Sequence, residues 1–202
     1  MELERVMGNN DGARSELAAF MRRLYARGLT TTFGGNISSR SPDGGFLITP
    51  SASDKATTSA GEIVAVDADG RAMDAAAPFK PSIEASAHAA VYRSRPDVSA
   101  VIHAHPVTVC AFAATSAEID SSLIIEAREL LGDIAYVPEL DMGSPELAEA
   151  IGSAAGGADC LVMRGHGALT VGRSLVEAFE RMEVLENAAK MTLITRGATG
   201  PL

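Results

Sequence analysis

The sequence contains no tryptophan and only two cysteines, Cys110 and Cys160, among its 202 residues. Both cysteines lie among apolar residues, which favours buried thiols in a reducing compartment over a disulfide framework or a cysteine-based metal site. Basic residues are also few, because 17 Lys and Arg stand against 26 Asp and Glu and give a formal net charge of −9. We therefore expect a cytoplasmic protein whose partners include neither nucleic acid nor an anionic membrane.

The chain also lacks the segments that are typical of secreted and membrane proteins. Residues 1–15 are polar and mixed in charge, so a signal peptide is not expected. Residues 98–117 carry no charged side chain over about the length of a membrane span, but they include His103, His105 and Pro106. A buried strand followed by a core helix accounts for this segment better than a membrane span does.

The remaining composition is ordinary for a globular protein, with 47% hydrophobic and 21% charged residues. No internal repeat, low-complexity tract or linker interrupts the chain. Segments with strand patterns alternate with segments of helical periodicity from one end to the other. This alternation predicts a single α/β domain over residues 1–202.

Local signals give the expected elements their limits. Gly28 is typical of a helix end, and Ser144 followed by Pro145 is typical of a helix start. The spacing of Ser174 and Glu177 matches a capping box. We expect helices over residues 15–27, 83–93, 110–114, 121–131, 145 to about 156 and 174–195, β-structure within 31–40 and at 46–49, 63–66, 98–103, 160–163 and 168–171, and a hairpin turn over 42–45.

Three histidines form the strongest chemical pattern in the sequence. His103 and His105 come at the end of an apolar strand, where residues two apart project from the same face. His166 stands between Gly165 and Gly167 after another apolar strand. Three imidazoles around one open position would make a catalytic zinc site. The alternative is that these are core histidines whose ring nitrogens are satisfied by backbone carbonyls.

Glu84 and His88 lie in the first turns of a predicted helix. The helix N-terminus favours an ionised Glu84, which could serve as metal ligand or base, the alternative being a solvated first-turn glutamate. His88 follows four residues later and shares its helical face. It could support a metal ligand or be an ordinary surface or core histidine, and we leave it out of the metal set.

Several segments together resemble the class II aldolase/adducin family over about residues 17–193. Those segments are Thr32–Arg40, Ile48–Ser51, Lys80–Glu84, Tyr92–Val98, Val101–His105 and Arg164–Gly167. The resemblance implies a three-layer α/β/α sandwich around a mainly antiparallel sheet. It also implies a homotetramer whose active sites lie at subunit interfaces.

The resemblance implies roles for the four residues already singled out. His103, His105 and His166 correspond to zinc ligands, although another divalent metal is open, and Glu84 corresponds to a ligand that is also the acid/base. The motifs are most similar to those of L-fuculose-1-phosphate aldolases. A zinc-dependent enzyme that cleaves a ketose 1-phosphate to dihydroxyacetone phosphate and an aldehyde is therefore expected.

The resemblance also implies a neutral cradle for the phosphate of a small sugar phosphate. Phe33 and Ile83 stand where the fuculose enzymes can have hydroxyl residues, and Ala52 replaces a frequent glycine. A different phosphate pose or an unphosphorylated substrate therefore stays open. The corresponding cradle residues are Gly35, Asn36, Ser51, Ala52 and Ser82.

The second acid/base is less well specified by the resemblance. Glu139 aligns with a tyrosine that the fuculose enzymes take from a neighbouring subunit, and Tyr136 is nearby but out of register. Asp133 resembles a proton-transfer residue of the related 4-epimerases, although a structural turn aspartate is the simpler interpretation. The alternative functions are a 4-epimerase, a dehydratase, a sugar-acid decarboxylase or a non-catalytic adducin-like binding module.

Overall fold

The computed structural model describes residues 2–42 and 44–198, with side chains for 11–42 and 44–197. Within these residues a 7-stranded sheet has the order β3-β2-β1-β4-β7-β6-β5. Neighbouring strands are antiparallel except for the parallel pair β5 and β6, so the mainly antiparallel expectation is confirmed and the sheet is mixed. The strands are β1 (Asn36–Arg40), β2 (Phe46–Ile48), β3 (Val64–Val66), β4 (Ala100–Ala104), β5 (Ile134–Val137), β6 (Cys160–Met163) and β7 (Gly167–Gly172).

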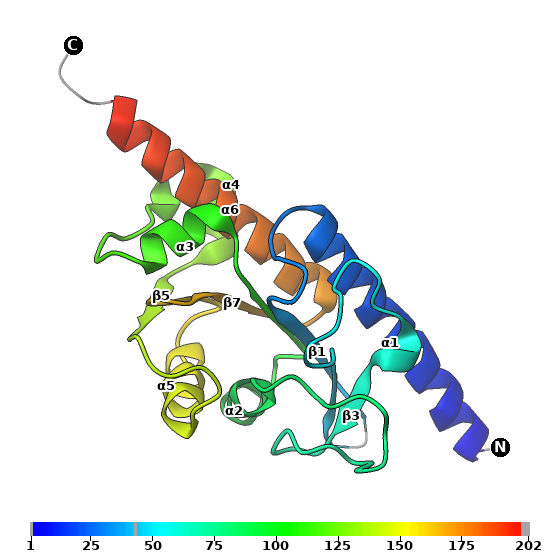
Figure 1. Cartoon of the computed structure of the whole chain (residues 1–202). Coiled ribbons are helices and arrows are strands. Elements are labelled where there is room, and N and C mark those ends of the chain that lie inside the picture. The colour runs from blue at the N-terminus through cyan, green and yellow to red at the C-terminus, as the bar shows by residue number, and fades with distance from the viewer. Residues whose placement is uncertain (1, 43, 199–202) are drawn as a thin grey trace.

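Helices cover both faces of this sheet and complete the expected three-layer sandwich (Figure 1). Alternate residues of β4 show the division, because Ile102 packs with the helices of one face and Val101 with those of the other. One layer contains α1 (Glu2–Ala26), α3 (Val107–Ala113), α4 (Ile125–Leu131) and α6 (Leu175–Ala198), and the other contains α2 (Ala85–Ser94) and α5 (Pro145–Ala155). Two short 3-10 helices, η1 (Ala60–Glu62) and η2 (Ser121–Leu123), lie in the connections.

The capping signals are confirmed with one change. Ser144 Oγ accepts from Leu147 N at 3.1 Å, and Ser174 Oγ accepts from Glu177 N at 3.2 Å. However, the Glu177 carboxylate accepts from Arg173 N at 2.9 Å instead of returning to Ser174. The reciprocal bond of the expected capping box is therefore made one residue earlier in the chain.

Several helix starts differ from the sequence-based limits. The helix α2 begins at Ala85 instead of residue 83, and the helix expected over 121–131 is divided into η2 and α4, which begins at Ile125. The first helix begins at Glu2 instead of residue 15, since the preceding segment contains no proline and carries acidic residues that a helix N-terminus favours. The expected helix at 110–114 begins earlier, at Val107. The β1–β2 hairpin is confirmed, but Asp43 of its expected turn lies outside the described residues.

Segment 98–117 folds as expected into the buried strand β4 and the helix α3. No helix within the described residues combines the length and the apolar character needed to cross a membrane.

A carboxylate on α6 explains why α3 starts early. The buried Glu186 carboxylate accepts from Thr108 N at 3.1 Å, from Thr108 Oγ1 at 2.8 Å and from Val109 N at 3.0 Å. Lys190 on the same helix lies 3.2 Å from this carboxylate. Glu186 thus caps α3 from a distant part of the chain and satisfies N–H groups that would otherwise be unpaired.

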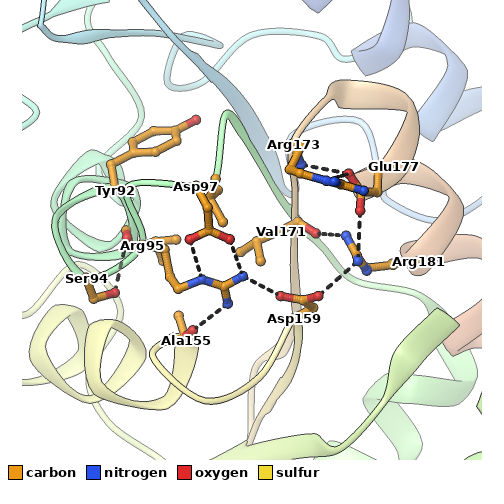
Figure 2. Close-up of polar contacts among 12 residues, drawn as sticks. Tyr92, Ser94, Arg95, Asp97, Ala155, Asp159, Val171, Arg173, Glu177 and Arg181 are labelled. Carbon is orange, nitrogen blue, oxygen red and sulfur yellow. Dashed lines mark hydrogen bonds and ion pairs between the residues drawn. The ribbon is translucent and has the colours of Figure 1, made fainter. Parts of the chain in front are cut away.

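Ion pairs connect the two helical layers at the end of the sheet where β6 begins and β7 ends. Asp159, just before β6, lies between two guanidinium groups, 2.9 Å from Arg95 and 2.9 Å from Arg181 (Figure 2). Arg181 also donates to Val171 O of β7 at 2.7 Å. This cluster joins α6, the start of β6 and the end of α2 with partly buried, multiply bonded charges, which contribute more than single exposed pairs.

We expect Glu186→Ala to lower the free energy of unfolding by about 2–3 kcal/mol, because two main-chain donors and a hydroxyl lose their acceptor. Urea unfolding followed by circular dichroism measures this. The matched control is Glu180→Ala, which removes an exposed carboxylate from the same helix and should change stability by less than about 0.5 kcal/mol. Equal losses in the two variants would contradict the capping role.

Candidate metal centre and active site

The structure brings His103, His105 and His166 together at one end of the central strands. Their candidate ligand atoms lie within 4.8 Å of one another. His103 lies on β4, His105 directly after it, and His166 in the turn between β6 and β7. Each Nε2 atom is buried and has no hydrogen-bond partner among the described residues. Three unpartnered imidazole nitrogens facing one point fit a divalent metal ion and do not fit satisfied core histidines.

The rings are held in the form that a metal ligand requires. His103 Nδ1 lies 2.9 Å from Ala168 O, so that nitrogen carries the proton and Nε2 keeps its lone pair. Burial, with smaller contributions from the His103 and His166 rings, lowers the pKa of His105 to about 4. Burial also lowers the pKa of His166. Neutral imidazoles are therefore available at ordinary pH.

Glycines allow main chain to approach the His105 ring closely. A methyl group at Gly34 would lie 2.7 Å from His105 Nδ1, and one at Gly167 would lie 2.6 Å from His105 Cδ2. Both distances are too short for contact with a Cβ atom, so only glycine fits at these two positions. The His105 ring therefore packs against glycine backbone on two sides. Gly167 makes room for the His105 ring.

Glu84 supplies a carboxylate beside the three rings. Its Oε2 lies 3.2 Å from His103 Nε2 and its Oε1 lies 3.5 Å from His166 Nε2. Burial would raise the pKa of Glu84, but the His103 and His166 rings and a hydrogen bond from Asn36 together lower it below its ordinary value. Three imidazoles and one ionised carboxylate thus form a donor set suited to a divalent cation such as zinc. The interpretation of Glu84 as a solvated glutamate is wrong, since only 6% of the residue is exposed.

The sequence of the chain matches a family model. The model of the class II aldolase and adducin N-terminal domain matches residues 15–193. The chain belongs to the class II aldolase and adducin family.

Individual members of the class II aldolase family give finer comparisons. An L-fuculose phosphate aldolase of Methanocaldococcus jannaschii is 32% identical over 181 residues, 90% of this chain and 96% of the relative. A 3-oxo-tetronate 4-phosphate decarboxylase of Escherichia coli is 31% identical over 186 residues, 90% and 86% of the two chains. The L-fuculose-1-phosphate aldolase structure from Thermus thermophilus superposes with a TM-score of 0.83 at 28% identity, covering 95% and 99%. The expected membership of a family of lyases is confirmed.

The expected cradle residues lie on segments that meet beside Glu84. Pro50 pairs with Pro81, and Ser51 N donates to Lys80 O at 3.0 Å, so the loop at 51–53 runs beside Ser82. Ser82 Oγ accepts from Glu84 N at 3.3 Å. Gly35 and Asn36 lead into β1, where Asn36 is the cross-strand partner of His103.

A buried lysine, which sequence reasoning missed, holds the loop at 51–53. Lys55 Nζ donates to Pro50 O at 3.0 Å and lies 3.3 Å from Ser53 Oγ. Within the loop, Ala52 has a φ of 52°, a left-handed conformation that costs a non-glycine residue about 1–2 kcal/mol. A glycine at this position would adopt the same conformation without that cost.

The two proposed proton-transfer residues lie at opposite ends of β5. The exposed Glu139 follows β5, and a methyl group at Gly165 would lie 2.8 Å from its Cδ, so its side chain is next to the His166 turn. The exposed Asp133 precedes β5, so its catalytic role stays a prediction. Tyr136 lies within β5 and its hydroxyl accepts from Ile119 N at 2.7 Å, which is a structural contact.

Metal retention tests the three-histidine centre. We expect the zinc-reconstituted protein to keep about one ion per chain after desalting, and His103→Ala to keep much less, because one of the ligands that close the site is lost. Elemental analysis of both proteins measures this, with Glu180→Ala as the control. The same zinc content in wild type and His103→Ala would leave the site without support.

Lys55 predicts a pH dependence of stability. Burial lowers its pKa to about 8 from 10.5, against a smaller opposing effect of Glu62. The unfolded chain then binds more protons than the folded chain within this window, so stability rises from pH 8 to 10.5. Across the window, wild type should gain up to about 3 kcal/mol relative to Lys55→Met. Urea unfolding at a series of pH values measures the difference, and parallel curves for the two proteins would refute the assignment.

Proposed function

We propose that the protein is a zinc-dependent aldolase that reversibly cleaves a ketose 1-phosphate resembling L-fuculose 1-phosphate. The products are dihydroxyacetone phosphate and an aldehyde. The carrying observation is the buried Glu84 carboxylate, whose oxygens lie 3.2 and 3.5 Å from the free nitrogens of His103 and His166. The relatives named L-fuculose phosphate aldolase support the substrate class.

His103, His105, His166 and Glu84 would hold the metal ion. When bound, the ion would act as a Lewis acid that withdraws electron density from the ketose carbonyl. The neutral imidazoles leave part of its charge available for this purpose, and the surrounding backbone of Gly34 and Gly167 limits the space for water.

Glu84 is proposed as the acid/base for the three-carbon product. In cleavage the bond between C3 and C4 breaks, and C3 of the dihydroxyacetone phosphate fragment must gain a proton. In synthesis the same proton is removed. The lowered pKa of Glu84 supports the carboxylate form, which is the base for synthesis, and a proton taken up during turnover is then donated in cleavage.

Glu139 is proposed as the acid/base for the aldehyde product. Cleavage removes a proton from the C4 hydroxyl as the aldehyde forms, and synthesis returns it. The placement of the exposed Glu139 side chain against Gly165, next to His166, supports this role. We propose an acid/base role for Asp133 only in an oligomer in which Asp133 of one subunit reaches the active site of another.

The phosphate is proposed to bind the neutral cradle formed by Gly35, Asn36, Ser51, Ala52 and Ser82. The Asn36 side chain already bonds to Glu84 and His88 at 2.8 and 2.6 Å, so its contact with phosphate would come from the main chain. The start of α2 and the Lys55 ammonium both add positive potential nearby. A local field of this kind can bind an anion despite a net charge of −9.

We also propose the expected homotetramer with active sites at subunit interfaces, in the cytoplasm. Exposed apolar side chains next to site residues support an interface there. Phe33 precedes Gly34 and is 68% exposed, Ile83 precedes Glu84 and is 58% exposed, and Val107 is 75% exposed. Burial of such side chains between subunits would be favourable.

Decarboxylation of a sugar-acid phosphate is the second candidate function. A relative of that name is 31% identical to the chain, close to the 32% of the aldolase relative. Glu139 in place of the aldolase tyrosine also distinguishes the chain from fuculose aldolases. The 4-epimerase and dehydratase reactions would use the same metal centre.

A substrate panel read by NMR tests the proposal. Metal-replete enzyme should form dihydroxyacetone phosphate from L-fuculose 1-phosphate, and a chelator should abolish the reaction. Glu84→Gln should lower kcat by about 100-fold or more, because proton transfer at C3 is lost. Release of carbon dioxide from 3-oxo acid phosphates without ketose cleavage would instead favour the decarboxylase. No chelator-sensitive product from any ketose phosphate would refute the aldolase.

A further inference from the structure

A buried chain of hydrogen bonds runs from Glu84 into the interior, away from the metal centre. Asn36 Nδ2 donates to Glu84 Oε2 at 2.8 Å, and Asn36 Oδ1 lies 2.6 Å from His88 Nε2. His88 Nδ1 lies 2.6 Å from Ser38 Oγ, which is 2.8 Å from the Tyr92 hydroxyl. These side chains are all buried, and His88 is completely inaccessible. The metal centre uses none of the four residues behind Glu84.

The chemistry of the groups fixes the direction of each bond. An ionised carboxylate only accepts hydrogen bonds, so Asn36 must present its amide nitrogen to Glu84 and its oxygen to His88. His88 Nε2 must therefore carry a proton. On a neutral ring Nδ1 then accepts from Ser38, whose oxygen accepts from Tyr92. All four donors point toward Glu84.

The N–H group of His88 therefore determines the orientation of the Asn36 amide. An asparagine amide has two orientations that differ by half a turn, and only one of them offers a donor to Glu84. The other would place Asn36 Oδ1 against the carboxylate oxygen and leave the His88 N–H facing an amide nitrogen. In a site without water access, that mismatch is costly.

We propose that His88 is a positioning residue that, through Asn36, holds the Glu84 carboxylate in the orientation needed at the metal centre. The proposal rests on the proposed function for its catalytic consequence, while its structural content, the His88 tautomer and the aligned carboxylate, does not. Glu84, His88 and Tyr92 are spaced four residues apart along the start and length of α2, and Asn36 and Ser38 are two apart on β1. One helical face therefore meets one strand face along the entire chain of bonds.

Two substitutions at position 88 separate positioning from packing. In His88→Gln the amide nitrogen can reach the place of Nε2 and still donate to Asn36. In His88→Asn the shorter side chain reaches only the place of Nδ1, so the donor to Asn36 is lost. Both variants remove a buried ring, and urea unfolding of each measures the stability cost that they share.

We expect His88→Asn to lower kcat by about 10–100-fold, with KM changed by less than about 3-fold, and to weaken zinc binding about 10-fold in a chelator competition. His88→Gln should stay within about 5-fold of wild type in both measurements. The control Ser94→Ala, exposed on the same helix, should match wild type. Equal losses in the two His88 variants would show a packing role only and overturn the proposal.

A third measurement does not depend on activity. Nitrogen-15 NMR of the imidazole side chains of the zinc-loaded wild type should show His88 as the neutral tautomer protonated at Nε2. A proton on Nδ1 instead would overturn the proposal even if the aldolase activity were found. If the substrate panel failed but the tautomer and the zinc-affinity difference were observed, the positioning role would stand and only the proposed reaction would fall.

Discussion

The pairing of β4 with both β1 and β7 is the constraint on which the rest of the site depends. The register places His103 opposite Asn36 on one side and Leu169 on the other, with Ala168 O in reach of the His103 ring. A slip of one residue would turn His103 to the opposite face of the sheet. It would separate the imidazoles and remove the Asn36 amide from Glu84. Metal geometry and carboxylate orientation therefore have the same origin in strand register.

The site also shows how an acidic chain can be suited to an anionic substrate. The buried imidazoles are kept neutral, so they offer lone pairs without adding charge. Glu84 is the carboxylate that approaches their nitrogens, and it is placed between the metal position and the Asn36 amide. Lys55 lies under the neighbouring loop with its ammonium on a carbonyl oxygen. Local placement of these groups, and not the net charge, sets the potential at the site.

Periodicity and caps in the sequence were sufficient for the α/β alternation and for many element limits, because they are local properties. The three layers and the shared role of the histidines were implied by the resemblance to the family. Contacts between distant segments could not be predicted in this way. Glu186, which is 78 residues from Thr108 in the sequence, explains the early start of α3. Lys55 is buried against Pro50, although lysine is usually exposed at protein surfaces. The role of His88 was left open for the same reason, since its spacing from Glu84 was visible but its bond to Asn36 required the β1 register.

Structural support and chemistry occupy opposite ends of the same strands. Asp159 and its two arginines bind at the beginning of β6, whereas His166 follows the end of that strand. Residues at the histidine end can therefore be exchanged without breaking the ion pairs that join helices to sheet. Such a separation lets a family acquire new reactions by changing loops alone, which is consistent with aldolases and decarboxylases of similar identity to one chain.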